Sequence, residues 1–109
     1  MTRELIGEFE QLVLLATLRL GDGAYAPAIL DEIERRTGRP ASPGSVYVTL
    51  DRLERKKLIR SRLAESSAER GGRPRRLVAV TARGVHELRA NRAALLALWR
   101  GLEGILEGT

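Results

Sequence analysis

The sequence predicts a mainly α-helical fold with one small β-hairpin and a long final helix. Apolar residues recur at helical spacing in three segments of the first half, residues 59 to 65 and 76 to 81 have the composition of strands, and the pattern is helical again from residue 82. With only 4% aromatic residues, the core must consist mainly of aliphatic side chains. At 109 residues the chain is long enough for one domain and too short for two.

The first two predicted helices supply most of this core. Residues 5 to 20 are expected to form a central, buried helix that is apolar nearly all round. One of its faces carries Phe9, Leu12, Val13, Ala16 and Leu20. After a turn at residues 21 to 23, Pro27 suits the first turn of a second helix, and Gly38 is expected to end that helix in a left-handed conformation.

The third predicted helix has a capped start and two different sides. Ser42 is expected to cap its N-terminus, with Pro43 as the first helical residue. The buried side is predicted from the spacing of Val46, Leu50 and Leu53. The opposite, outward side is predicted to consist of Ser45, Thr49, Arg52 and Lys56.

Positive charge is concentrated in one quarter of the chain. Residues 52 to 76 carry ten basic and three acidic side chains, whereas the whole chain has a net charge of +5. Such a surface favours a polyanionic partner, because phosphate binding releases counterions; a merely solubilising surface is the alternative. The hairpin tip, RGGRPR at residues 70 to 75, combines glycines that let backbone approach a phosphate with arginines that suit phosphates or a narrow minor groove. A disordered surface turn is the alternative for this tip.

Three helices followed by a basic hairpin indicate a winged helix-turn-helix domain over residues 1 to 81, with double-stranded DNA as its partner. The third helix is then the recognition helix. We expect Arg52 to read a guanine edge, with Ser45 and Thr49 making lighter contacts nearby. The cations expected at phosphates or in the minor groove are Lys56, Arg70, Arg73, Arg75 and Arg76.

Residues 82 to 109 are predicted to form a C-terminal dimerisation helix. A continuous helix from 82 to 107 would be about 40 Å long at ~1.5 Å per residue, which is too long to lie wholly on so small a body. Its apolar stripe consists of Leu88, Leu95, Trp99, Leu102 and Leu106. A second copy of the chain would cover this stripe, and the alternative is that the helix folds back on its own domain.

The sequence offers no support for catalysis, for a cofactor or for a metal site. It contains no cysteine, and its single histidine, His86, has no acidic cluster at ligand spacing. The RGGR segment lacks the Gly-Lys-Ser/Thr ending of a phosphate-binding loop. No signal-peptide pattern and no apolar run of roughly 20 residues is present, so the protein is expected to be cytoplasmic and not membrane-bound.

Three motifs together resemble the PadR-like transcriptional regulators, a winged-helix family of bacteria and archaea. These motifs are GEFEQLVLLATLRLGDGAYAPAILDEI (7 to 33), SPGSVYVTLDRLERKKLI (42 to 59) and RGGRPRRLVAVTARG (70 to 84). The resemblance implies a regulator, usually a repressor, that binds an inverted-repeat operator as a homodimer. It places DNA contacts on the wing and on the third helix, at Ser42, Ser45, Tyr47, Thr49 and Arg52. In the short subclass the single C-terminal helix packs with the partner's first helix, which adds Phe9 and Leu12 to the expected interface.

One departure from the family concerns Lys57. Members usually have glycine there, at a position that favours φ > 0, so Lys57 is either a strained turn residue or an added phosphate contact. Two other functions stay open. The protein is alternatively a sensor that binds a small-molecule effector at the dimer seam near Trp99, or a winged-helix module for protein interactions.

Overall fold

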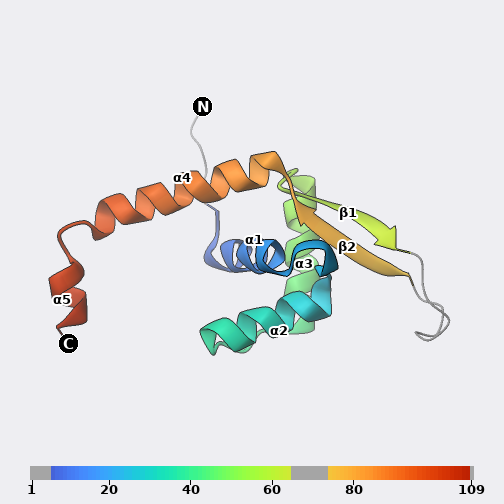
Figure 1. Cartoon of the computed structure of the whole chain (residues 1–109), viewed down its shortest axis with the longest axis horizontal. Coiled ribbons are helices and arrows are strands. Elements are labelled where there is room, and N and C mark those ends of the chain that lie inside the picture. Colours follow the sequence, from blue (N-terminus) through green and yellow to red (C-terminus); the bar gives the residue numbers. More distant parts are fainter. Residues whose placement is uncertain (1–5, 65–73, 109) are drawn as a thin grey trace.

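The computed structural model describes residues 6 to 64 and 74 to 108 and confirms the predicted fold class (Figure 1). The elements are α1 (Glu8–Leu20), a short 3-10 turn (Gly21–Gly23), α2 (Ala26–Thr37), α3 (Pro43–Arg55), β1 (Ile59–Ala64), β2 (Arg75–Val80), α4 (Ala82–Trp99) and α5 (Glu103–Glu107). Helices α1, α2 and α3 pack together, and the two strands form an antiparallel hairpin beside them (Figure 1).

The core lies between α1, α2 and α3 and is aliphatic, as predicted. Its largest fully buried side chains are Leu14, Ile29, Leu50, Leu53, Val13 and Val46. One expectation for α1 is wrong, because Leu15 and Leu18 are about half exposed, so this helix is not covered on all sides. Burial of the core side chains is worth about 1.5 to 3 kcal/mol for each large aliphatic residue.

The predicted helix ends are confirmed at α2 and α3. Gly38 ends α2 with φ 71° and ψ 2°, the left-handed conformation expected of it. Ser42 caps α3, and its Oγ accepts a hydrogen bond from the Ser45 N–H at 3.1 Å. Pro43 is the first residue of α3, where its missing N–H leaves no intrahelical bond unmade.

The turn after α3 contains Lys57 with φ 64°, so the positive φ expected at this position is confirmed. The Lys57 N–H donates to the Glu54 carbonyl and the Leu58 N–H to the Leu53 carbonyl, both at 2.9 Å. This pair of bonds is the Schellman pattern of helix ends. The same turn receives α4, since the Thr81 Oγ1 donates to the Lys57 carbonyl at 2.9 Å. The start of α4 is therefore attached to the end of α3.

The hairpin is attached to the helices on the side opposite its tip. Ile59 pairs with Val80 at the base, and Ala64 pairs with Arg75 at the outer end of the described ladder. The Val78 N–H donates to the Ala24 carbonyl at 2.9 Å, which joins β2 to the connection between α1 and α2. The hairpin therefore extends from the body as a wing (Figure 1).

The expectation of one continuous helix from residue 82 to 107 is wrong. Helix α4 ends at Trp99, Gly101 adopts φ 88°, and α5 begins at Glu103. Glycine favours such a break, and every residue from 92 to 108 is exposed, so no packing opposes it. The outer part of α4 extends beyond the three-helix body (Figure 1). The radius of gyration is accordingly 16.1 Å, against about 13 Å for a compact chain of this length.

Candidate nucleic-acid interface

The outward face of α3 differs from the predicted one. Thr49 is only 4% exposed, so the expectation that it faces outward is wrong. It lines a hollow together with Phe9 of α1, and α1 packs against α3. Ser45 and Arg52, at the edge of the same side, are exposed as predicted.

Two residues that the sequence reasoning missed lie on the middle of the outward face. Val48 is 55% exposed and Arg55 is also exposed. Helical geometry was the available signal, because residues two positions after Val46 and Leu53 lie about half a turn away from the buried side. Tyr47, which was predicted, is exposed beside them.

The N-terminal serines of α3 are partly occupied with each other. The Ser42 Oγ lies 2.7 Å from the Ser45 Oγ and also accepts the Ser45 N–H. Both side chains are exposed at the end of the helix. Ser42 therefore has a structural role as the cap, and the hydroxyl of Ser45 is the more available of the two.

A groove of about 550 Å³ separates the outward face of α3 from the wing. Its lining residues are Val48, Asp51, Glu54, Arg55 and Arg76. Two of these five side chains are carboxylates, which is unexpected on a surface meant for phosphates.

Arg76, one of the predicted phosphate contacts, is held within the molecule. Its Nη1 lies 3.0 Å from the Asp51 Oδ1 and its Nη2 lies 2.9 Å from the Glu54 Oε1. The pKa of Glu54 is lowered most by a hydrogen bond from Ser61 and next by one from Arg76. Partial burial opposes the charge of Arg76, but its bonds to Glu54 and Asp51 outweigh that effect and raise the pKa of Arg76.

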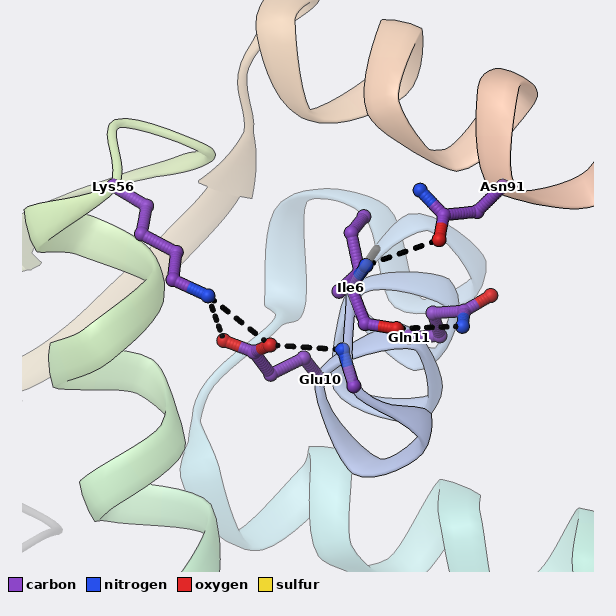
Figure 2. A network of polar contacts seen from close by, with 6 residues as sticks. Ile6, Glu10, Gln11, Lys56 and Asn91 are labelled. Atoms are coloured by element: carbon purple, nitrogen blue, oxygen red, sulfur yellow. Dashed lines mark hydrogen bonds and ion pairs between the residues drawn. The ribbon is translucent and has the colours of Figure 1, made fainter. Parts of the chain in front are cut away.

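Lys56, another predicted phosphate contact, is also paired. Figure 2 shows its side chain extending from α3 to Glu10 of α1, with Nζ 2.9 Å from Oε2 and 3.2 Å from Oε1. Burial would raise the pKa of Glu10, yet the Lys56 ammonium and the Gly7 N–H hold that pKa below its ordinary value. A phosphate contact by Lys56 would have to share the ammonium with this carboxylate.

The same network reaches α4. The Asn91 Oδ1 accepts the Ile6 N–H at 3.0 Å, and the Gln11 Nε2 donates to the Ile6 carbonyl at 3.1 Å (Figure 2). Asn91 is buried although it is polar, and its Nδ2 donates to the Glu87 carbonyl at 2.8 Å. Helices α3 and α4 are thus both hydrogen-bonded to the N-terminal end of α1.

The predicted wing contacts are only partly described. Arg70 and Arg73 lie outside the described residues, whereas Arg75 is placed with its guanidinium 4.3 Å from the centre of the Tyr25 ring. This cation–π contact orients Arg75 at the outer end of the described ladder. Tyr25, Tyr47 and Arg75 line a common hollow of about 450 Å³, and Tyr25 was not among the predicted site residues.

The predicted dimer stripe divides between the core and the surface. Leu88 is 8% exposed and belongs to the core of its own chain, so its assignment to an interface between chains is wrong. Phe9 and Leu12 are partly buried and line a hollow next to the connection between α2 and α3. About half of each remaining predicted side chain is exposed; these are Leu95, Trp99, Leu102 and Leu106.

Residues 6 to 64 and 74 to 108 contain neither a candidate metal cluster nor a candidate membrane span. In these ranges no group of three histidine, aspartate or glutamate side chains could hold a metal ion. None of the helices described is both long and apolar enough to cross a membrane.

Comparison with protein families decides the family of this fold. Residues 14 to 90 match the model of the transcriptional regulator PadR-like family. The chain belongs to this family. The matched range runs from α1 through the wing into α4, so it includes every described element of the candidate interface. A comparison with curated proteins found no match.

Solved structures of PadR-like regulators have the same fold as this PadR-like chain. A PadR-like transcriptional regulator from Bacillus cereus is 22% identical, with 93% of each chain covered and a TM-score of 0.72. A PadR family transcriptional regulator from Eggerthella lenta is 26% identical and covers 94% of this chain and 88% of its own, with a TM-score of 0.68. A PadR family regulator from Clostridium difficile is 22% identical over 90% of this chain and 98% of its own, with a TM-score of 0.69.

Family membership establishes the general role of this PadR-like regulator. It is a transcriptional regulator that acts through DNA, and it is not an enzyme. The effector and protein-interaction alternatives stay predictions.

Proposed function

We propose that this PadR-like regulator is a sequence-specific repressor that binds an inverted-repeat operator as a homodimer in the cytoplasm. The observation that carries the proposal is the pairing of two surfaces on one chain. The exposed face of α3 lies beside a basic wing, and an uncovered apolar face lies on the outer part of α4 and on α5. The first surface suits a DNA groove, and the second suits another copy of the chain.

Base reading falls to exposed side chains of α3. Arg52 is exposed and forms no ion pair among the described residues, so its guanidinium is available to bond a guanine edge bidentately. Val48, in the middle of the outward face, suits apolar contact with a thymine methyl group. Ser45, Tyr47 and Arg55 complete the surface that we assign to the major groove.

We assign the phosphate contacts to the wing. Arg75 is oriented by Tyr25, and its N–H groups remain able to donate in the plane of the guanidinium. Arg70 and Arg73 stay predicted contacts at the wing tip. Such contacts raise affinity for every sequence and make binding depend steeply on salt.

The homodimer follows from the exposed apolar side chains of α1, α4 and α5. Those about half exposed include Leu15, Leu18, Leu95, Leu96, Trp99, Leu102 and Leu106. Leu15 and Leu18 replace Phe9 and Leu12 as the contribution of α1, because the latter two face the connection between α2 and α3. Two recognition helices related by a two-fold axis would meet half-sites roughly 34 to 36 Å apart.

DNA recognition is tested with the promoter of the protein's own gene. The wild-type protein should protect an inverted repeat in a footprint, and repression should be lost when the repeat is scrambled. Arg52→Ala should weaken operator binding by about 1 to 3 kcal/mol and relax the preference at one base position. Arg89→Ala, on the exposed side of α4, is the matched control with the same charge change and should bind as wild type does. Equal affinity for every duplex at physiological salt would rule out operator recognition.

Dimerisation is tested by sedimentation at several protein concentrations. The wild-type protein should sediment as a dimer of about 24 kDa, twice the 12.0 kDa of one chain. Trp99→Ala should weaken the dimer by about 2 kcal/mol or more, because large aromatic side chains dominate interface energies. Leu63→Ala, an exposed leucine of β1, is the control. A wild-type protein that stays monomeric at high concentration would refute the homodimer.

A further inference from the structure

We propose that Arg76 is a positioning residue and is not itself a phosphate contact. It holds the wing against the recognition helix and neutralises two carboxylates in the groove between α3 and the wing. The inference rests on the proposed DNA-binding function and reassigns one of its predicted contacts. It concerns the groove between α3 and the wing, which Arg76 lines together with Asp51 and Glu54.

The contacts of Arg76 join three elements. The side chain starts on β2 and its guanidinium bonds to Asp51 and Glu54, which lie on consecutive turns of α3. Glu54 in turn accepts a hydrogen bond of 2.6 Å from the Ser61 Oγ of β1. The Arg76 guanidinium therefore connects β2 to the outward face of the recognition helix, and the shared partner Glu54 connects that face to β1. A planar fork with two separate donors suits this role, and an ammonium does not.

Exposure shows which partner of each ion pair faces solvent. The Arg76 side chain is 29% exposed, whereas Asp51 is 64% and Glu54 is 44% exposed. The carboxylates thus lie nearer the surface that a duplex would approach. Without a cation beside them, two negative charges in this groove would repel phosphates at close range. Arg76, which is less exposed than either carboxylate, lowers that repulsion.

The other cations of this surface are differently placed. Arg55 lines the same groove and, among the described residues, forms no ion pair. Arg52 is exposed on the neighbouring turn of α3. These two are available to DNA, and Arg76 is already committed.

The test measures operator affinity for Arg76→Gln in two backgrounds. In the wild-type background Arg76→Gln should weaken binding at least tenfold. In an Asp51→Asn/Glu54→Gln background the same change should weaken binding less than threefold, because the carboxylates it neutralised are gone. The dependence of affinity on salt should have the same slope for Asp51→Asn/Glu54→Gln with and without Arg76. Arg62→Gln, an exposed arginine of β1, is the matched control, and its effect should be the same in both backgrounds.

Two outcomes would overturn the inference. An equal loss in both backgrounds, with a salt slope reduced by about one, would make Arg76 a direct phosphate contact. No loss in either background would leave it without a role in binding. Thermal unfolding of each variant identifies any that fold poorly, and Arg76→Lys, which keeps the charge but not the fork, should then bind between wild type and Arg76→Gln. A wild-type protein that binds no duplex would instead refute the proposed function, and this inference with it.

Discussion

The inner and outer halves of α4 have opposite environments although they belong to one helix. In the inner half Gly84, Leu88 and Asn91 are buried against the body, whereas every residue from 92 to 108 is exposed. Although the outer half is exposed, it carries large apolar side chains. Leu98 is 76% exposed, and about half of the Trp99 side chain is exposed.

This difference separates two sources of stability. The inner half is held by contacts within the chain. Thr81 is hydrogen-bonded to Lys57 and Asn91 to Ile6, and Gly84 packs closely against Leu58. The outer half carries large apolar side chains that are about half exposed or more. Its helix also breaks at Gly101, because glycine destabilises a helix and no packing there compensates for it. Changes in the inner half should therefore affect folding, and changes in the outer half should affect association.

Matched leucine truncations should show the largest contrast. Leu88→Ala should lower the free energy of unfolding by about 2 to 5 kcal/mol, because it leaves a cavity in the core. Leu98→Ala should change it by less than about 0.5 kcal/mol, as surface substitutions usually do. Urea unfolding at one fixed protein concentration measures both. A Leu98→Ala loss as large as that of Leu88→Ala would mean that the outer half is packed after all.

Two glycines offer the next contrast. A Cβ on Gly84 would lie 2.3 Å from the Leu58 carbonyl oxygen and 2.6 Å from the Val80 Cγ1, so Gly84→Ala should cost about 1 to 3 kcal/mol. A Cβ on Gly104 of α5 would meet nothing within 4 Å, so Gly104→Ala should stabilise the helix by up to about 1 kcal/mol. Thermal unfolding compares the two variants. If Gly84→Ala were neutral, the close contact of α4 with the end of α3 would be wrong.

The Glu10–Lys56 pair should make stability depend on pH. Because the pKa of Glu10 is lowered in the folded state, its contribution is present above its ordinary pKa of 4.5 and is lost as pH falls through the folded value. The difference in unfolding free energy between wild type and Glu10→Gln should therefore be full at pH 7 and shrink in acid. In a Lys56→Met background this loss in acid should be smaller, because the Gly7 N–H is then the main remaining group that lowers the pKa of Glu10. The same acid dependence with and without Lys56 would contradict the role given to the ion pair.

The two left-handed helix ends should give the smallest effects, with opposite signs. Lys57→Gly should stabilise the protein by about 0.5 to 1 kcal/mol, since glycine adopts φ 64° without the penalty of a Cβ. Gly38→Ala should destabilise it by about 1 kcal/mol, because φ is 71° there and no Cβ contact compensates. Denaturant unfolding measures both. If Lys57→Gly also lowers the salt slope of DNA binding by about one, Lys57 is a phosphate contact as well.

Local features of the fold could be predicted from the sequence. The cap at Ser42, the left-handed Gly38 and the two strands each depend on residues within a few positions of one another. The apolar spacing of Val46, Leu50 and Leu53 was equally local and gave the correct buried side of α3. The family resemblance rested on the same local motifs, and the family match confirms it.

The exact outward surface was decided by contacts between distant segments. Thr49 is buried in the folded chain, Lys56 bonds to a residue 46 positions away, and Arg76 bonds to one 22 positions away. Helical periodicity sets only angles about an axis, and it does not say which neighbouring helix covers each side. The sequence by itself therefore determined the first three helices, the two strands, the ends of α2 and α3, and the family. Only the tertiary structure decided which cations remain available to DNA and which half of α4 stays uncovered, because both depend on where separate elements pack.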